Sequence, residues 1–475
     1  MSFGNFSLSL QQSFRGCAEV YCLLAAHENC SDLFDCHPLI REYFGRQLRE
    51  MQHDAWRQAH TLLYEYYKAL PEKLYSKKFP DTLQEMQPLF LAVAHGCAAG
   101  FYQLVLSEIY ISRIQRDHDN NYTCNILGAF SDDLATVAHF FTTPWHIPVS
   151  NLHVLSQAAV LNWAGFRLLA LGRLREALRP MEASGEIYVN QRHWQFAAKS
   201  IYTFSKLQLA LGNVEEAIGS GQRSIGYADQ SGCLIERKCS RATLANALHQ
   251  SGKPVLALTM FSEAEKLQQK QLPTYPYLYS VSGFEYCNLL LAQDRTEEAR
   301  ERAENDLDWW INHFKNGKNG GRLSFSLPKL TLGHVHLQQG DFLQASNWLE
   351  QAIDSLRTAG MEHYLPSGLL ARAALYRNIR NPNHDITRAR QDLQEVFDIA
   401  ESSGMRLHLT DYHLEMVRLL IAEKEDSTQS PSGKDELTVQ EHAVQAAKLI
   451  DETGYKRHLP ELQELQSKIN LLKYD

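Results

Sequence analysis

The sequence lacks most of the features that mark a membrane protein, a secreted protein or a nucleic-acid-binding protein. Its longest apolar run, VYCLLAA at 20–26, falls far short of the roughly 20 residues that a membrane span needs. Lys/Arg runs never exceed two residues, and 47 basic against 55 acidic residues give a net charge of −8, which favours neither nucleic acid nor an anionic membrane. The first residues show neither the basic start nor the apolar core of a secretory signal. We expect a cytoplasmic chain with no nucleic-acid or membrane partner.

Metal-binding patterns are also absent. None of the nine cysteines forms a CxxC pair, and no Cys/His spacing typical of a zinc site follows. A single cluster at the N-terminal end comes closest to a ligand set: Cys17, Cys22, Cys30, Cys36 and His37. Buried thiols in a reducing compartment explain this cluster better than a metal does. We therefore expect no metal and no cofactor.

Catalytic motifs are missing as well. Neither HExxH nor GxSxG occurs. His334 and His336 are two positions apart on a predicted helix, so they point to different faces and cannot easily share a metal. Trp309 and Trp310 are more simply interpreted as a packed helix face than as a ligand platform, and the glycine-rich stretch 316–321 as a long turn. The sequence does not predict an enzyme.

What the sequence does contain is an internal repeat. The segments LALGRLREAL (169–178), LALGNVEEAI (209–218) and LHQSGKPVLAL (248–258) each read as a helix end, a glycine turn and the start of a second helix. One alanine recurs in the second helix at intervals of 40, 40, 42, 46 and 44 residues: Ala177, Ala217, Ala257, Ala299, Ala345 and Ala389.

A second position keeps the same register. Twelve residues before the first five alanines stand small residues, which let two antiparallel helices approach closely: Gly165, Ser205, Ala245, Cys287 and Gly333. The sixth unit has Arg377 there instead. Fifteen residues after three of the alanines comes a glycine suited to a helix C-cap: Gly232, Gly360 and Gly404. The pattern predicts an all-α fold of tetratricopeptide-like helical hairpins, stacked as an α-solenoid in a right-handed superhelix.

The repeat also divides the chain. We expect tetratricopeptide-like repeats over 148–423, preceded by irregular helical hairpins over 51–147, where 52–70 and 86–114 have helical apolar spacing. The polar segment 424–436, with Ser, Pro and Gly, is typical of a flexible loop. Residues 437–475 are predicted to form capping helices. Residues 1–50 do not repeat and are predicted to be an irregular or partial winged-helix-like segment.

The superhelix model predicts a concave groove lined by the first helix of each pair. Residues eleven positions before the marker alanines are expected to face it: Phe166, Lys206, Asn246, Asn288, His334 and Asn378. Five of the six are polar with hydrogen-bond donors, which suits a peptide backbone or a carboxylate. A helix face that is simply wetted by solvent explains the same pattern, and the two interpretations stand side by side.

Several stretches resemble the C-terminal half of bacterial STAND-class (NACHT or NB-ARC) signalling NTPases. They are HPLIREYFGRQLRE (37–50), AVAHGCAAGFYQLVLSEIY (92–110), LGAFSDDLATVAHFF (127–141), YPYLYSVSGFEYCNLLL (275–291) and LIDETGYKRHLPEL (449–462). The resemblance implies a winged-helix tail at 33–50 followed by a tetratricopeptide sensor. It covers the chain from about residue 35 onward.

One element of that family is missing from this sequence. No GxxxxGK[ST] loop occurs, because the Gly-Lys pairs at 252–253, 317–318 and 433–434 lack the upstream glycine and the Ser/Thr. ATP hydrolysis is therefore not implied. The resemblance implies a non-catalytic module that senses a protein or peptide ligand in its groove and works with a separate P-loop ATPase. The alternative is a free-standing scaffold that holds two protein partners.

Overall fold

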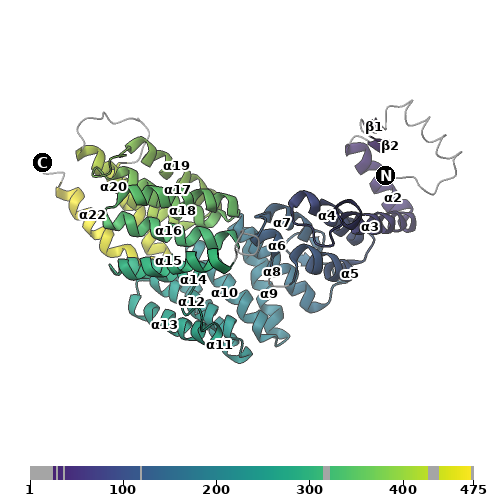
Figure 1. Ribbon diagram of the computed structural model, residues 1–475, viewed down its shortest axis with the longest axis horizontal. Coiled ribbons are helices and arrows are strands. Elements are labelled where there is room, and N and C mark those ends of the chain that lie inside the picture. Colours follow the sequence, from purple (N-terminus) through teal and green to yellow (C-terminus); the bar gives the residue numbers. More distant parts are fainter. Residues whose placement is uncertain are drawn as a thin grey trace.

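The computed structural model shows an all-α solenoid built of consecutive helical hairpins (Figure 1). The cysteine–histidine cluster, except for Cys30, lies outside the described residues, as do nearly all of the predicted loop 424–436 and of the glycine-rich turn 316–321. Within the described residues, no helix is both long enough and apolar enough to cross a membrane. The structure describes residues 25–27, 30–35, 38–117, 120–313, 321–425 and 438–471.

The N-terminal part is irregular. A two-stranded antiparallel hairpin, β1 (Ala25–His27) and β2 (Cys30–Asp35), precedes the helices. Gly100 interrupts the helix expected over 86–114, because its φ of +89° lies outside the helical region. The elements that follow β2 are α2 (Pro38–Met51), α3 (His53–Tyr75), α4 (Leu83–Ala98), α5 (Tyr102–Val105), the π-helix η1 (Leu106–Gln115), α6 (Tyr122–Asn125), α7 (Phe130–Ala138) and the short hairpin β3 (Phe141–Thr143) and β4 (Ile147–Pro148).

From α8 onward, each helix packs against the next. The pairs are α8 (Val154–Ala170) with α9 (Leu174–Asn190), α10 (Trp194–Ala210) with α11 (Val214–Ser231), α12 (Leu234–Gln250) with α13 (Pro254–Gln271), α14 (Ser280–Leu291) with α15 (Thr296–His313), α16 (Arg322–Gln339) with α17 (Phe342–Ala359), and α18 (Leu365–Arg377) with α19 (Ile386–Ser403). A 3₁₀ turn, η2 (Glu362–Tyr364), precedes α18, and α20 (Arg406–Glu425), α21 (Val439–Thr453), η3 (Lys456–His458) and α22 (Leu459–Leu471) complete the chain.

The small residues of the repeat lie at the contact between paired helices, as predicted. Ser205 Oγ donates a hydrogen bond to the carbonyl oxygen of Ala217 at 2.7 Å. Gly333 leaves no room for a side chain, since a Cβ there would lie 2.5 Å from Leu349 Cδ2. The predicted C-cap glycines are confirmed too, with positive φ values of 67°, 68° and 75° at Gly232, Gly360 and Gly404.

The departure of the sixth unit has a structural cause. Eight residues, 378–385, connect α18 to α19, whereas three, 171–173, connect α8 to α9. The longer turn moves Arg377 to the last position of α18. Ala373 takes the place of the small residue and packs in one buried cluster with Ala389. The unit is therefore complete, and only the spacing between its two markers is longer.

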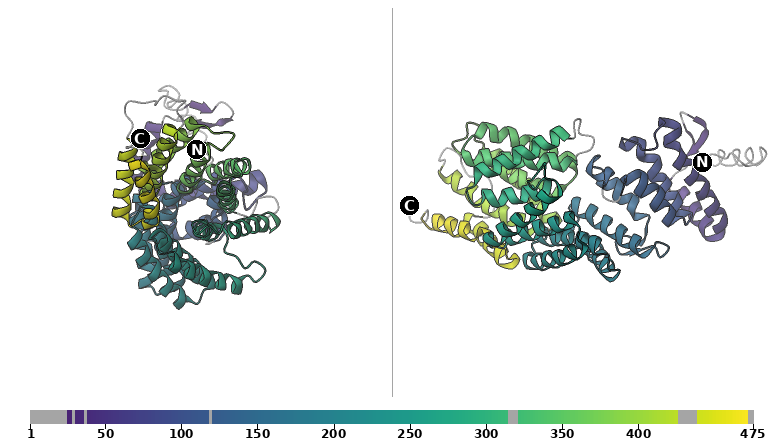
Figure 2. Two further views of the ribbon diagram at one scale, coloured as in Figure 1. Left: turned by 90° about the vertical axis from the view of Figure 1, so that its left-hand side faces the viewer. Right: turned by 60° about the horizontal axis from the view of Figure 1, so that its bottom comes forward.

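The solenoid turns far enough for late units to contact early ones. Viewed along the long axis, successive helices follow one another around a common centre (Figure 2, left). Leu207 of α10 and Leu211, the C-cap of that helix, share a hydrophobic core with Met405 and Leu409, which belong to the α19–α20 region. The superhelix thus brings its late units against its early ones, and its inner face surrounds a cavity.

Candidate ligand-binding cavity

A cavity of about 620 Å³ lies at the centre of the superhelix. Its size is within the range of pockets that bind ligands. Its wall is formed by the first helices of the pairs, namely α8, α10, α12, α14 and α18, together with the 120–126 segment, the start of α16, α20 and residues 455 and 457. Because both early and late units contribute, the cavity exists only in the closed superhelix.

Four of the six predicted groove residues line this cavity: Phe166, Lys206, Asn246 and Asn288. Each is half-buried, and each follows directly a buried small residue that faces the paired helix. Successive residues of an α-helix point about 100° apart, so a small residue toward the partner helix places the next side chain toward the cavity. The repeat spacing thus corresponds to the helix face that lines the cavity, and ligand binding by these residues stays a prediction.

The other two predicted residues lie elsewhere. His334 and Asn378 line a separate cavity of about 280 Å³ between α14, α16 and α18. Asn378 is the C-cap of α18, and its Oδ1 accepts a hydrogen bond from the backbone N–H of Arg380 at 3.0 Å. The long turn of the sixth unit explains its position, because it places residue 378 after the helix instead of on its inner face.

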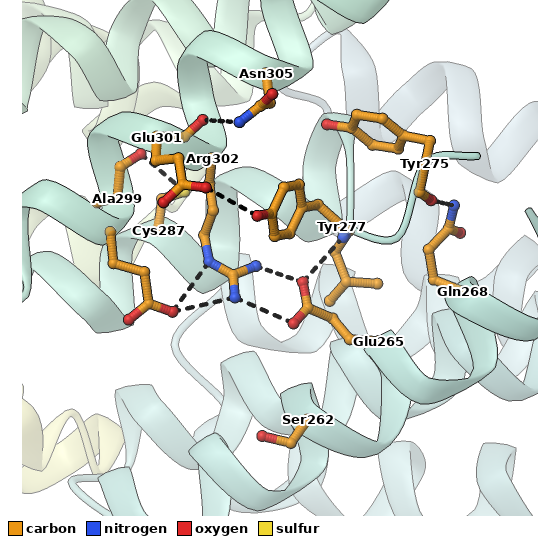
Figure 3. A network of polar contacts seen from close by, with 12 residues as sticks. Ser262, Glu265, Gln268, Tyr275, Tyr277, Cys287, Ala299, Glu301, Arg302 and Asn305 are labelled. Atoms are coloured by element: carbon orange, nitrogen blue, oxygen red, sulfur yellow. Dashed lines mark hydrogen bonds and ion pairs between the residues drawn. The ribbon is translucent and has the colours of Figure 1, made fainter. Parts of the chain in front are cut away.

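The segment before α14 is fixed by a polar network (Figure 3). Glu265 of α13 pairs with Arg302 of α15 and accepts a hydrogen bond from the backbone N–H of Leu278 at 3.2 Å. Tyr277 donates to Glu301 at 3.0 Å, and Gln268 Nε2 donates to the carbonyl oxygen of Tyr275 at 2.9 Å. These contacts set the position of α14, which carries five cavity residues.

Aromatic packing supports the same region. Trp309 stacks on Tyr279 with ring centroids 5.7 Å apart, and Trp310 packs at 6.1 Å from Phe325. The interpretation of the two tryptophans as a packed helix face agrees with these contacts, although one side of Trp310 also lines the cavity.

The floor of the cavity near α8 is built on a buried ion pair. Arg167 Nε lies 2.6 Å from Asp133 Oδ2, and both side chains are fully buried. Tyr110 and Gln115 donate further hydrogen bonds to Asp133 at 2.9 and 2.6 Å. Burial by itself lowers the pKa of Arg167. The neighbouring Cys124, Tyr110 and Asp133 outweigh this effect, and the pKa lies above its ordinary value. This network joins the irregular N-terminal helices to the first repeat.

A second carboxylate, Glu285 of α14, lines the cavity itself. It is 6% exposed, and its Oε1 accepts a hydrogen bond from Asn246 Nδ2 at 3.1 Å. Lys206 Nζ lies 4.0 Å from the same oxygen, and Gln250 donates to Asn246 Oδ1 at 2.7 Å. Burial raises the pKa of Glu285. Lys206 and Asn246 lower it, but they offset the effect of burial only in part. Its Oε2 is buried and has no hydrogen-bond partner among the described residues.

Asp411 of α20 faces the cavity from the other side and is well satisfied. Tyr455 donates to it at 3.1 Å, His458 Nε2 lies 3.2 Å from Oδ1, and His408 Nδ1 lies 3.4 Å from Oδ2. Burial alone raises the pKa of Asp411, but the hydrogen bonds from the two histidines and the charge of Arg457 hold it well below its ordinary value. Asp411 therefore serves to join α20 to the C-terminal residues.

His363 of η2 adds an uncharged ring to the cavity. Burial, followed by the charges of His408 and Lys206, lowers its pKa to about 3, so the ring is neutral at physiological pH. Its Nδ1 has no hydrogen-bond partner among the described residues.

Sequence reasoning missed two groups of cavity residues. The first group lies three or four positions from a predicted residue, on the same helix face, so helical spacing could have found it. Glu285, three positions before Asn288, and Tyr202, four positions before Lys206, are examples. Others, such as His363, Asp411 and Arg457, reach the cavity only because the superhelix closes. No sequence pattern indicates that second group.

The arrangement is suited to binding. Within the described ranges, no three His, Cys, Asp or Glu side chains converge in a way that would hold a metal ion. Amide, lysine, carboxylate and tyrosine side chains instead offer donors and acceptors around a cavity with aromatic walls.

Comparison with known proteins gives weak similarities only. No family model and no curated protein matches the sequence. The crystal structure of a Rap protein complexed with competence and sporulation factor matches with a TM-score of 0.49 and 11% identity, over 86% of this chain and 99% of that chain. A tetratricopeptide repeat protein from Parabacteroides merdae ATCC 43184 has a TM-score of 0.34 and 14% identity, over 65% and 98% of the two chains.

A third solved structure is a STAND protein with a tetratricopeptide repeat sensor from Pyrococcus horikoshii. Its TM-score is 0.29 at 12% identity, and the match covers 94% of this chain and 58% of that chain. With TM-scores below 0.5, these similarities carry no inference about ligand or activity, which must come from the cavity of this chain.

Proposed function

We propose that this chain is a non-catalytic module that binds a peptide, or an extended segment of a protein, in its central cavity. The observation that carries the proposal is the row of polar side chains on the inner faces of α10, α12 and α14: Lys206, Asn246 and Asn288. An asparagine amide both donates and accepts, so it can pair with the N–H and C=O groups of an extended backbone whatever the peptide sequence.

The closed superhelix suits a sensor better than a passive scaffold. A ligand that touches α12 on one side and α20 on the other contacts two parts of the solenoid that are far apart in sequence. Such a ligand binds the closed form more tightly than any opened form, and it therefore shifts the population toward closure. A scaffold that holds two partners needs no such change.

The signalling context of this sensor is part of the proposal and rests on the STAND resemblance of the sequence. In that context residues 33–50 are the end of a winged-helix domain, and a separate P-loop ATPase reads the ligand-bound state. Sequencing the DNA next to this reading frame tests the point. A P-loop module encoded there supports a split signalling ATPase, and its absence favours the scaffold.

The binding function is tested with a pool of random, terminally capped peptides. We expect the full chain to retain peptides from the pool and the triple variant Lys206→Ala/Asn246→Ala/Asn288→Ala to lose most of that retention. A matched triple variant of exposed residues on the outer helices, Gln222→Ala/Lys266→Ala/Gln269→Ala, should retain peptides like the parent. Equal retention by all three proteins, with helicity unchanged by circular dichroism, contradicts the proposal.

Sensor and scaffold are separated by a second measurement on the retained peptide. A sensor should show slower amide hydrogen exchange in the turns that close the superhelix when the peptide is bound. An unchanged exchange pattern outside the contacted helices favours the scaffold.

A further inference from the structure

Two carboxylates line the central cavity, and they differ in how fully they are hydrogen-bonded. Asp411 has both oxygens engaged, because Tyr455 Oη lies 3.1 Å from Oδ1 and 3.4 Å from Oδ2, and His458 Nε2 lies 3.2 Å from Oδ1. Glu285 uses one oxygen only, and its Oε2 is buried without a partner among the described residues. A buried carboxylate oxygen that lacks a donor is costly, by an amount comparable to a lost charge-assisted hydrogen bond.

The surroundings do not supply the missing donor. The nearest cation, Lys206 Nζ, lies 4.0 Å from Oε1, which is too far for a hydrogen bond and on the oxygen that Asn246 already occupies. Asn246 is itself held by Gln250 at 2.7 Å. The carboxylate is thus fixed from α12, and Glu285 is one of the residues that line a cavity large enough for a ligand.

The neighbouring rings favour a positively charged group at that oxygen. Phe284, the residue before Glu285, packs edge-on against Tyr364 with centroids 6.3 Å apart, and both rings line the cavity. Burial, with the charge of Glu285 as a further cause, raises the pKa of Tyr364, so its hydroxyl stays protonated. An anionic carboxylate beside aromatic rings is the arrangement that binds ammonium and guanidinium groups.

We propose that Glu285 determines the ligand specificity of the cavity by receiving a cationic group of the bound peptide, a lysine or arginine side chain, on its Oε2. The inference rests on the proposed peptide-binding function and names the chemical class of its ligand. In the free protein Lys206 Nζ lies 4.0 Å from the same carboxylate. Its positive charge repels the incoming cation, and the interaction between Lys206 and Glu285 weakens when the ligand binds.

The test uses three pools of capped peptides that are random except for one central residue: lysine, norleucine or glutamate. Norleucine keeps an aliphatic side chain without the ammonium, so the comparison isolates the charge. We expect the full chain to retain the lysine pool about tenfold to a hundredfold more strongly than the norleucine pool. Glu285→Gln should abolish this preference. Glu182→Gln, on the exposed face of α9, is the matched control and should preserve it.

A reciprocal variant makes the test directional. Lys206→Gln removes the competing cation, so the preference for the lysine pool over the norleucine pool should rise about two- to tenfold, even if total retention of both pools falls. If the site instead takes an anion on Lys206, the signs reverse: Lys206→Gln weakens and Glu285→Gln strengthens retention of the glutamate pool. That reversal overturns the inference, as does equal retention of the lysine and norleucine pools by the full chain. In both cases peptides are still bound, whereas the failure of every pool to be retained overturns the peptide-binding function itself.

Discussion

Gly172 lies against Ser403, although more than two hundred residues of sequence separate them. A Cβ atom added to Gly172 would stand 2.7 Å from Ser403 Oγ. Gly172 belongs to the turn between α8 and α9, and Ser403 is the last residue of α19. The same relationship recurs one unit later, where a Cβ at Gly212 would stand 2.8 Å from Thr453 Cγ2. These turn-to-turn contacts close the superhelix and define the cavity.

The closure contact predicts a specific cost for one alanine substitution. Gly172 and Gly232 both have positive φ, 70° and 67°, but nothing lies within 4 Å of a Cβ at Gly232. Gly232→Ala should lower the free energy of unfolding by about 1 kcal/mol through backbone strain alone. Gly172→Ala should lower it by about 2–3 kcal/mol, because a steric term is added. Urea denaturation measures both values.

A double-mutant cycle identifies the steric term. Ser403→Ala removes the atom nearest to the added Cβ and leaves Glu362 Oε2, at the end of a flexible side chain, at 3.3 Å and Ser403 Cβ at 3.7 Å. In that background, most of the excess cost of Gly172→Ala over Gly232→Ala should disappear. An excess that is unchanged by Ser403→Ala would mean that this contact does not hold the superhelix closed.

The small residues of the repeat predict a contrast between two glycines within helices. Gly333→Ala should destabilise the chain by about 1–3 kcal/mol, because the new Cβ would stand 2.5 Å from Leu349 Cδ2. Gly219→Ala in α11 should stabilise it by about 0.5–1 kcal/mol, since nothing lies within 4 Å and alanine is the better helix former. Thermal or chemical denaturation measures the change in the free energy of unfolding for both variants. Equal changes at the two positions would contradict the close packing at Gly333.

The buried pair Arg167–Asp133 predicts strong coupling. Asp133→Asn leaves the guanidinium unpaired at a fully buried position and should cost about 3–5 kcal/mol. Adding Arg167→Met removes the stranded charge, so the double variant should be less destabilised than the sum of the single variants. The exposed pair Glu42–Arg46 is the control, and Glu42→Gln should cost less than about 1 kcal/mol. Additive effects at 133 and 167 would contradict the coupling.

The histidine pair His413–His442 predicts a loss of stability in mild acid. Their Nδ1 atoms lie 2.8 Å apart, and burial, then the charge of His442, lowers the pKa of His413 to about 4. Between pH 6.5 and 4 the unfolded histidine binds a proton that the folded one does not, so stability is present above pH 6.5 and falls as the pH drops. This contribution is at most about 3 kcal/mol.

The measurement compares His413→Gln with the parent chain. The difference in free energy of unfolding between the two proteins should decrease from pH 7 to pH 4, because the variant lacks the titrating ring. His153→Gln, at an exposed position, is the matched control. Parallel pH profiles of the parent chain and His413→Gln would show that the buried pair does not link protonation to folding.

The sequence by itself determined the local structure of the repeats. Helical pairs, their small contact residues such as Ser205 and Gly333, and the capping glycines such as Gly404 follow from spacing, because each concerns residues that are close along the chain. The same spacing placed Lys206 and Asn246 on the inner face. It failed at Asn378, where a longer turn shifts the register without changing the helices that it joins.

Only the tertiary structure decided that the inner face encloses a cavity. Each hairpin rotates slightly against the next, and the sum of these small rotations brings Ser403 to Gly172 and Asp411 opposite Glu285. No single residue encodes that sum, because it depends on the packing of every pair in between. The same holds for Glu285. Its sequence context is that of any glutamate in a helix, and only the tertiary structure buries its carboxylate without a donor for the second oxygen.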